Sequence, residues 1–457
     1  MKLKIIVRAK RDSDAVKATI RTFYPDWNIS VSTVKGIRDP WKALEKISEL
    51  IDPLAYNIVL VGLQESSWRE VEEKLPPNAV VHIVKRSKIR NARIEMIYHE
   101  IERAKAVFRN HVEWNNTYIL YPRIKPLIRE AYNPAFDVYL AYGEGFHEAL
   151  RSLTDKHVPL PLLVYKGLGA SNYLFYGPIM VGELPIPDTG KPWLRVVKEV
   201  AEEYDVDLKS ILRENADVIR VYENIAVENM KNVSGEYDRI FVPWSGGKDS
   251  TAAVILSKKA FGGKKMKAVF VDTGVDFPFN IEYVEKTSKI LGVDVVVTYS
   301  GVREGLREHG LPTHDNRWCT KYKIKALYNC IRDECSRGDR VLIVVGDRDA
   351  ESLLRGKRPF TRSHEEFHQI APLKMWSGLQ VQLYLTANNI PSNPLYEEGF
   401  YRIGCYICPA LRSWEVMIMT DNSRIWNKIR GLPCLREFLD YRLRSTGEFD
   451  VEDPPSQ

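Results

Sequence analysis

The chain has 457 residues, of which 44% are hydrophobic and 28% are charged, and its formal net charge is +6 at pH 7. This length exceeds what one hydrophobic core organises, so two or three globular domains are expected. The modest positive charge favours anionic partners such as a nucleotide or RNA. No segment is apolar enough to span a bilayer, and the first residues turn polar too soon for a signal peptide, so we expect a cytoplasmic protein without membrane contact.

The N-terminal stretch alternates strand-like and helix-like segments, which predicts an α/β module at residues 1–125. A basic run follows the last strand of this module: Lys85, Arg86, Lys88, Arg90 and Arg93. The run is either a nucleic-acid face or the solvated start of a helix. We favour the solvated start, because no aromatic residues are interleaved with the charges.

The next segment, residues 126–190, contains short apolar and aromatic runs separated by glycines and prolines, which predict a small β-rich module. A proline-rich passage at 183–193 then leads into two helical patterns, at residues 194–204 and 208–230. We therefore predict a helical linker at residues 191–235, with the main domain boundary near residue 190.

Beyond the linker, strand and helix patterns alternate again, and the strands are apolar enough to be buried on both faces. This predicts an α/β domain at residues 236–415, built on a doubly wound parallel sheet, with a helical tail at 416–457. Ligands of such sheets gather beyond the carboxyl ends of the strands. Three loops lie there: Ser245–Ser250, Asp272–Asp276 and Gly346–Arg358.

The first of these loops reads as a pyrophosphate cradle between a strand and a helix. Its residues are Ser245, Gly246, Gly247, Lys248, Asp249 and Ser250. The two glycines allow a tight turn, the helix amides and dipole attract phosphate, and the lysine adds a full positive charge. The spacing differs from a Walker loop and from the dinucleotide glycine pattern. The alternative is an ordinary Gly-Gly turn.

The other two loops add polar and basic groups at the same edge. Asp272 and Thr273 end a strand, where the carboxylate is suited to a ribose or adenine donor or to a Mg²⁺ ion that bridges phosphates, the alternative being an aspartate that caps a turn. The third loop concentrates four cations: Arg348, Arg355, Lys357 and Arg358. Arginines bind phosphate and sulfate oxygens in a bidentate way, so we expect an anionic substrate, with a solvated charge run as the alternative.

Together the motifs SGGKDS, VFVDTGVDFPFNIEYV, RWCTKYKIKAL, VVGDRDAESLLRGKRP and IPSNPLYEEGFYRIGCYIC resemble the phosphoadenosine phosphosulfate (PAPS) reductase family of the PP-loop ATP pyrophosphatases. The resemblance covers roughly residues 235–415 and implies the adenine nucleotide alpha-hydrolase type of fold. It also implies that Ser245–Ser250, Asp272 and Thr273 bind ATP or an adenylyl sulfate-type nucleotide. Lys248, Arg348 and Arg355 would act on the anionic end.

All six cysteines lie in the C-terminal third of the chain. In the iron–sulfur branch of the family an R-C-C-x-x-x-K motif and a C-x-x-C motif ligate a [4Fe–4S] cluster. Here Cys319, Cys405 and Cys408 match three ligands, while Trp318 replaces the fourth. Either Cys434 completes the set, or the fourth iron is open to a small ligand; a structural zinc site and a plain thiol pair are the alternatives. The remaining two, Cys330 and Cys335, are interpreted as core or incidental.

These motifs imply an adenine-nucleotide-dependent enzyme of sulfur metabolism. The sequence after Cys434 lacks the E-C-G-x-H motif of thiol-dependent reductases, which places sulfonucleotide reduction in doubt. The second chemistry is ATP-driven adenylylation followed by sulfur transfer to tRNA or another acceptor, with the N-terminal half as an RNA-docking surface. A third hypothesis is a sensor that binds nucleotide without turnover.

Overall fold

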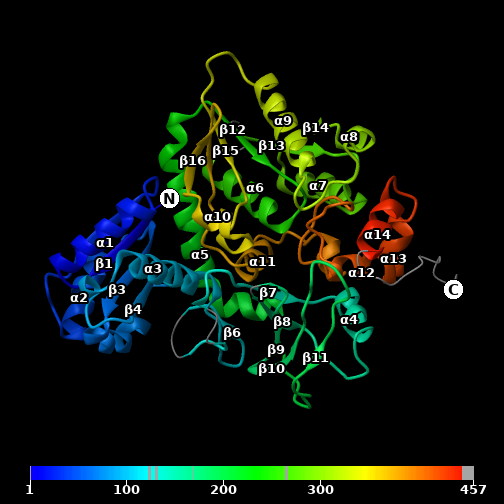
Figure 1. The fold of residues 1–457 in the computed structure, drawn as a ribbon. Coiled ribbons are helices and arrows are strands. Elements are labelled where there is room, and N and C mark those ends of the chain that lie inside the picture. Colours follow the sequence, from blue (N-terminus) through cyan, green and yellow to red (C-terminus); the bar gives the residue numbers. More distant parts are fainter. Residues whose placement is uncertain (1, 122–124, 129–131, 168, 263–265, 445–457) are drawn as a thin grey trace.

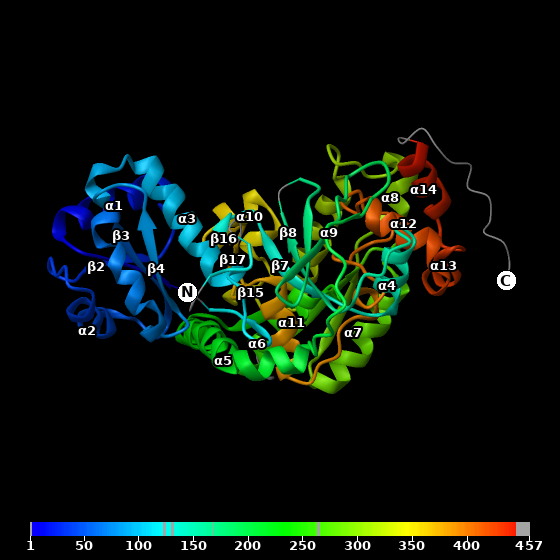
Figure 2. The same cartoon turned by 90° about the horizontal axis from the view of Figure 1, so that it is seen from below.

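The computed structural model describes residues 2–121, 125–128, 132–167, 169–262 and 266–444. It contains three main β-sheets, of four, five and six strands, which follow one another along the chain. Figures 1 and 2 show the four-stranded N-terminal sheet at one end of the molecule and helices α12–α14 at the other. None of the described helices has both the length and the apolar character needed to cross a bilayer.

The N-terminal sheet is parallel, with strand order β2-β1-β3-β4. Its strands are β1 (Lys2–Val7), β2 (Ile29–Thr33), β3 (Ala55–Gly62) and β4 (Ala79–Val84). Its helices are α1 (Lys10–Phe23), α2 (Pro40–Leu50), η1 (Leu63–Lys74), η2 (Ile89–Asn91) and α3 (Ile94–Asn110). Strand β3 is buried along its whole length, because Ile58 packs toward α3 while Val59 packs toward α2 and η1. The predicted α/β module is confirmed.

The β-rich sheet is antiparallel, with strand order β11-β10-β9-β8-β7. Its strands are β7 (Asp137–Ala141), β8 (Leu162–Lys166), β9 (Asn172–Tyr176), β10 (Ile179–Glu183) and β11 (Arg195–Val196), with α4 (Glu144–Arg151) after β7. A separate short hairpin precedes it, formed by β5 (Glu113–Trp114) and β6 (Tyr118–Ile119). The predicted β-rich module is thus also present.

The linker departs from the prediction in its first half. Residues 194–204 are not helical: they form β11 and extended chain, and Val197 N donates to Val181 O of β10. Leu194, Val196 and Tyr204 pack against the apolar core of the β-rich sheet, so burial at the sheet edge overrides the helical pattern. The second half does form a helix, α5 (Leu208–Val233), followed by the short η4 (Ser234–Glu236).

The C-terminal sheet has the order β14-β13-β12-β15-β17-β16, parallel except for β16. Its strands are β12 (Arg239–Pro243), β13 (Met266–Asp272), β14 (Val295–Tyr299), β15 (Val341–Val344), β16 (Thr361–His364) and β17 (Phe367–Ile370). The helices of this part are α6 (Lys248–Phe261), α7 (Pro278–Leu291), α8 (Val302–His309), α9 (Trp318–Asp333), η5 (Asp349–Glu351), α10 (Leu353–Lys357), α11 (Gly378–Ala387), η6 (Pro394–Tyr396), α12 (Ser413–Asp421), α13 (Ser423–Ile429) and α14 (Leu435–Arg444).

Helices cover both faces of this sheet, as predicted. Ile240 and Val242 of β12 pack in one core with helices α5, α6 and α11, whereas Phe241 packs on the opposite face with Tyr328 and Ile331 of α9. The strand order reverses at β12, because β13 lies on one side of it and β15 on the other. A topological switch point of this kind leaves a crevice at the carboxyl ends of the two strands.

Apolar packing also joins the three sheets. One core contains Ile58 of the N-terminal sheet, Val138 of the β-rich sheet and Val242 of the C-terminal sheet. The predicted domain limits at residues 125, 190, 235 and 415 stay predictions. Because the three sheets share one core, side chains from the first half of the chain lie close enough to reach the crevice of the C-terminal sheet.

Candidate functional site: a basic cavity at the switch point

Residues Ser245–Ser250, which we call the phosphate loop, join β12 to the start of α6. Gly246 has a φ of +78°, and a Cβ at this position would lie 3.1 Å from Asn280 O, so the turn requires glycine on both counts. Asn393 supports the turn by donating from Nδ2 to Gly246 O at 3.2 Å. The residue before the helix, Gly247, provides no side-chain cap. The helix N-terminus is therefore left open toward the crevice.

The side chains of the loop are held by one another and by a tyrosine. Ser250 Oγ donates to Gly247 O at 3.0 Å and lies 3.2 Å from Ser245 Oγ. The backbone N–H of Lys248 donates to Tyr396 Oη at 2.9 Å. Lys248 Nζ donates to Asp249 at 3.2 Å and lies 5.2 and 5.3 Å from the ring centroids of Tyr396 and Tyr401, so an ion pair and two cation–π contacts fix its direction.

Arg348 lies beneath the phosphate loop and is only 1% exposed. Its Nε donates to Asp249 at 2.6 Å, and its Nη1 donates to both oxygens of Asp137 at 3.0 and 2.9 Å. Burial alone would raise the pKa of both carboxyl groups, but Arg348 outweighs it and holds each pKa below its usual value. A guanidinium held by two carboxylates supports the loop, and Arg348 also lines the crevice, so its predicted action on the anionic end stays a prediction.

The remaining arginines of the third loop are gathered around one carboxylate. Arg358 and Arg362 pair with Asp347 at 3.3 and 2.8 Å, and Arg355 lies 3.6 Å from the same carboxylate while also pairing with Glu351. Burial would raise the pKa of Asp347, yet Arg355 and Arg362 together lower it. Three cations with two carboxylates leave a net positive surface in the cavity that the phosphate loop also lines.

In the second predicted loop, Asp272 and Thr273 bond within their own turn. Asp272 Oδ1 accepts from Gly274 N at 2.7 Å, which is the turn-capping alternative. Thr273 is 1% exposed and donates from Oγ1 to Asp276 at 2.6 Å, and of the residues in this loop Asp276 lines the crevice. A contact of Asp272 or Thr273 with a nucleotide stays a prediction.

The four predicted metal ligands share one apolar core but not one ligand sphere. Cys319 and Cys405 are buried in this core, and Cys408 and Cys434 pack against it. Cys405 Sγ accepts from Lys323 Nζ at 3.0 Å, and burial raises the pKa of this thiol to about 12 although Lys323 acts in the opposite direction. Over the described ranges, no three His, Cys, Asp or Glu side chains come together as metal ligands. The donor set therefore does not fit a cluster, zinc or Mg²⁺ as arranged, and no chemical step is derived through one.

The crevice is a cavity of about 990 Å³. Ten Lys and Arg side chains line it against six Asp and Glu, and the aromatic rings of Tyr396 and Tyr401 form part of its wall. This is the upper end of the roughly 300–1,000 Å³ that small-molecule sites occupy. Its lining combines the open helix N-terminus with a surplus of cations, an arrangement suited to a polyanion such as a nucleotide.

Sequence reasoning missed two contributors from the β-rich sheet, Asp137 and Lys166. No local signal marks either residue, because both stand at the ends of ordinary strands. Tyr396 and Tyr401 could have been predicted as site residues, since both belong to the motif IPSNPLYEEGFYRIGCYIC that resembles the family.

The domain that holds the loop and cavity has known counterparts. Its sequence matches the phosphoadenosine phosphosulfate reductase domain over residues 239–411. Residues 239–411 form a PAPS reductase domain. The roughly 240 residues before it carry no family assignment. The match confirms the predicted resemblance and begins at the first residue of β12.

Relatives of the PAPS reductase domain include proteins of different names. An uncharacterized protein of Methanocaldococcus jannaschii is 34% identical over 253 residues, covering 54% of this chain and 51% of that one. An adenosine 5′-phosphosulfate reductase of Deinococcus radiodurans is 28% identical over 159 residues, covering 34% and 61%. A sulfate adenylyltransferase subunit 2 of Hahella chejuensis is 25% identical over 256 residues, covering 51% and 82%.

The chain thus spans only about half the length of the Methanocaldococcus relative. Among solved structures, a PAPS reductase from Candida auris in complex with phosphate is similar over 46% of this chain and 98% of that one, with 17% identity and a TM-score of 0.33. A score this low adds nothing to the domain match.

Proposed function

We propose that this protein is an adenine-nucleotide-dependent enzyme of sulfur metabolism that acts at the α-phosphate of its nucleotide or at the sulfate group joined to it. The observation that carries the proposal is the phosphate loop, which opens the N-terminus of α6 into a basic cavity within a PAPS reductase domain. Relatives named adenosine 5′-phosphosulfate reductase and sulfate adenylyltransferase subunit 2 support the connection to sulfur.

The proposed mechanism is electrostatic positioning. The amides of the phosphate loop and the Lys248 ammonium bind the phosphate or sulfate oxygens, and Arg355 faces them across the cavity as the second cation. Charge that develops on the oxygens during bond cleavage is stabilised by these fixed groups without reorganisation of water. In this scheme Arg348 is a positioning residue, because it holds Asp249 of the loop and its guanidinium is already paired with two carboxylates.

Two chemistries satisfy this arrangement: reduction of an adenylyl sulfate, and ATP-dependent adenylylation followed by sulfur transfer to tRNA or another acceptor. The cavity volume of about 990 Å³ favours a reaction in which the nucleotide meets a second substrate. The iron–sulfur centre expected from the sequence is not part of this scheme, because the four cysteines do not share one ligand sphere. Iron and sulfide analysis of anaerobically purified protein tests for it separately, and finding both would show that the cysteines do hold a cluster.

The test is to incubate the protein separately with ATP, adenylyl sulfate and phosphoadenylyl sulfate, each with and without a dithiol reductant, and to identify the products. Release of AMP with pyrophosphate from ATP assigns adenylylation. Reductant-dependent release of sulfite, with AMP from adenylyl sulfate or with adenosine 3′,5′-bisphosphate from phosphoadenylyl sulfate, assigns reduction, because the dithiol supplies the two electrons and is oxidised to a disulfide. Lys248→Ala is expected to weaken nucleotide binding by about tenfold to a hundredfold, because a charge-assisted phosphate contact is lost. Lys259→Ala is the matched control, since Lys259 is on the same helix but points away to pair with Glu223.

The competing hypothesis is a nucleotide sensor without turnover. Tight, Lys248-dependent ATP binding without any product from the three nucleotides would favour the sensor and overturn the enzyme. Equal ATP binding by the wild type and Lys248→Ala would overturn both, because each rests on the phosphate loop.

A further inference from the structure

Lys166 brings a cation into the cavity from outside the PAPS reductase domain. It is the last residue of β8, and the register of the β-rich sheet places it directly opposite Asp137, the first residue of β7. Both residues thus stand at the edge of the β-rich sheet that meets the reductase domain. Lys166 lines the same cavity as the phosphate loop.

The carboxylates nearest to Lys166 are committed elsewhere. Asp137 accepts from Arg348, from Gly378 N at 2.9 Å and from Tyr401 Oη at 2.8 Å. Glu415 accepts from the backbone N–H of Arg412 at 3.0 Å. Across the described residues the Lys166 ammonium makes no hydrogen bond or ion pair, and its closest recorded partner is the Tyr401 ring, at 4.7 Å from the centroid.

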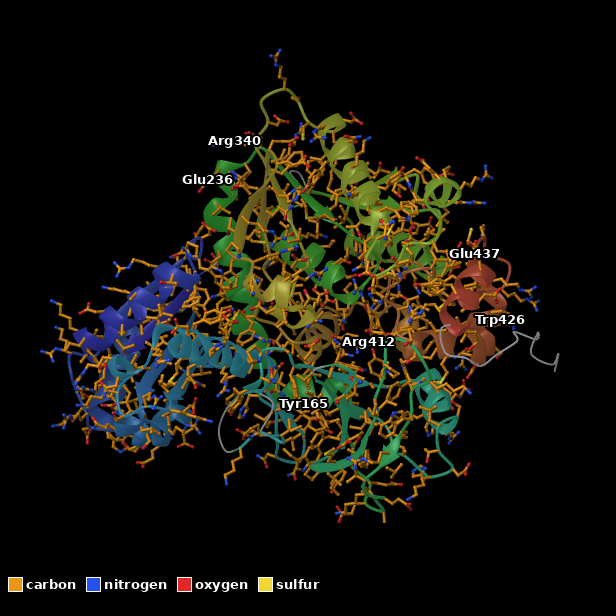
Figure 3. The ribbon with its side chains drawn as sticks, viewed as in Figure 1. Tyr165, Glu236, Arg340, Arg412, Trp426 and Glu437 are labelled. Atoms are coloured by element: carbon orange, nitrogen blue, oxygen red, sulfur yellow. The ribbon has the colours of Figure 1, made fainter. Side chains whose placement is uncertain are left out.

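The Tyr401 ring connects Lys166 with the phosphate loop. Lys248 Nζ lies 5.3 Å from the centroid of the same ring, so the two ammonium groups have a common neighbour on the cavity wall. On the other side Arg412 is anchored to the β-rich module, where Nη1 donates to Gly169 O at 2.8 Å, and its Nε pairs with the exposed Asp188 at 3.4 Å. Figure 3 labels Arg412 where the C-terminal chain meets the β strands.

A largely buried cation without a counter-ion is costly to maintain. Burial lowers the pKa of Lys166 to about 8, with Asp137 opposing the shift and Arg412 adding to it. At neutral pH most of the Lys166 side chains are therefore still charged, although none of the described residues forms a hydrogen bond or ion pair with the ammonium. An unpaired cation in a cavity is expected where a ligand supplies the missing anion.

We propose that Lys166, with Arg412 beside it, forms an oxyanion subsite that the β-rich module contributes to the cavity. The subsite takes the phosphate or sulfate group of the substrate that meets the nucleotide held on the phosphate loop. This inference rests on the proposed function for the nucleotide end, and it gives the β-rich module a role: it completes the active-site cavity. The shared chemistry of its ligand is a tetrahedral oxyanion.

The test uses wild-type protein and pyridoxal 5′-phosphate, which joins a phosphate group to an aldehyde. The aldehyde condenses with an uncharged lysine amine with loss of water, and borohydride then reduces the imine to a stable secondary amine. Peptide mass spectrometry gives the labelling rate of each lysine. Lys166 is expected to react about tenfold or more faster than the exposed Lys156 of the same module, because its amine is more often uncharged and the phosphate is attracted beside it.

Inorganic sulfate or phosphate should slow the labelling of Lys166 and leave that of Lys156 unchanged, with sodium chloride at equal ionic strength as the control. Labelling of Lys166 at the rate of Lys156, or no protection by either anion, would overturn the subsite even if ATP binds. ATP binding by wild type and Lys248→Ala is measured alongside. Equal binding by these two proteins overturns the proposed function, so the two failures are distinguishable.

Discussion

Two parallel sheets of this chain have the same architecture and differ in what their carboxyl edges hold. The N-terminal sheet and the C-terminal sheet both reverse strand order in the middle, between β1 and β3 in one and between β12 and β15 in the other. Each switch point is a potential ligand crevice. The comparison shows that architecture supplies the location, while the loop residues decide whether it becomes a site.

At the N-terminal edge the protein's own side chains occupy the switch point. Arg8 follows β1, is 8% exposed, and pairs through Nε with Glu65 at 2.8 Å. Its Nη1 also donates to Gly36 O at 3.3 Å. The cation that a phosphate would need at this edge is thus already neutralised by a carboxylate.

At the C-terminal edge the loop that follows the central strand β12 contains two glycines. Gly246 and Gly247 leave the N-terminus of α6 open, and the buried arginine of this region, Arg348, is paired beneath the loop instead of across its mouth. Cations on the cavity wall then outnumber the carboxylates. The position of the ion pairs therefore distinguishes the two sheets: the pair at the N-terminal switch point fills it, whereas the pairs of Arg348 leave a cavity at the C-terminal one.

Among the variants that test this difference between the two sheets, Asp137→Ala is expected to change the unfolding free energy most. The change leaves Arg348 buried with one carboxylate instead of two, and breaking a buried pair costs about 3–5 kcal/mol of unfolding free energy. Urea unfolding measures the loss. Asp217→Ala, which removes an exposed ion pair with Arg220, is the control and should change stability by less than about 0.5 kcal/mol. A loss below about 1 kcal/mol for Asp137→Ala would contradict the supporting role of the Arg348 pair.

A second prediction compares two glycines that end strands at the two switch regions. A Cβ on Gly346 would lie 2.9 Å from the backbone of Asp249, and one on Gly62 would lie 2.6 Å from Ser87 O. Each alanine variant should lose about 1–3 kcal/mol of unfolding free energy through overpacking. Only Gly346→Ala should also weaken ATP binding, measured by calorimetry, because it displaces the phosphate loop. Weaker ATP binding in Gly62→Ala would show that the N-terminal edge is coupled to the site.

The sequence predicted the parts of the site that local physics determines. The phosphate loop needs two glycines between an apolar strand and a helix, and Gly246 indeed takes a positive φ. The parallel sheet followed from strands apolar on both faces, as Phe241 and Val242 are. Both features depend only on neighbours along the chain.

The rest depends on contacts between distant residues. Arg348 was expected to bind the anionic end of the nucleotide. The sequence gives no sign that its guanidinium also donates to Asp137, 211 positions away. The sequence allowed Asp272 to be a ligand or a turn cap, and the hydrogen bond from Gly274 N to its carboxylate is visible only in the folded turn. Residues 194–204 carry a helical pattern that loses to burial at a sheet edge. Lys166 gives no signal in the sequence, because its proposed role arises from its lack of an ion pair among the described residues.

A third prediction concerns the unpaired cation itself. Burial lowers the folded-state pKa of Lys166 to about 8, so between pH 8 and the ordinary value of about 10.4 the unfolded chain binds more protons than the folded one. Wild-type stability should therefore rise with pH in this window. Lys166→Met removes the cost and should be more stable than wild type at pH 7, by on the order of 1–3 kcal/mol, with the difference shrinking toward pH 10.

Thermal or urea unfolding at pH 7 and pH 10 measures this difference. Lys156→Met is the control, since Lys156 is exposed and pairs at the surface with Glu199, and its stability difference should not depend on pH. A Lys166→Met protein that is less stable than wild type at pH 7 would show that the ammonium has a stabilising partner.

The smallest effect is expected at the basic run of the N-terminal edge. Lys85 and Arg86 follow β4 and are exposed, so replacing both with glutamine should change the unfolding free energy by less than about 0.5 kcal/mol and leave ATP affinity unchanged. The same double variant tests RNA docking. If these cations contact phosphates, the slope of log affinity against log salt for a tRNA should fall by about one for each charge removed. An unchanged slope would mean that this run is a solvated helix start. The N-terminal sheet would then have a structural role, in contrast to the C-terminal sheet with its binding cavity.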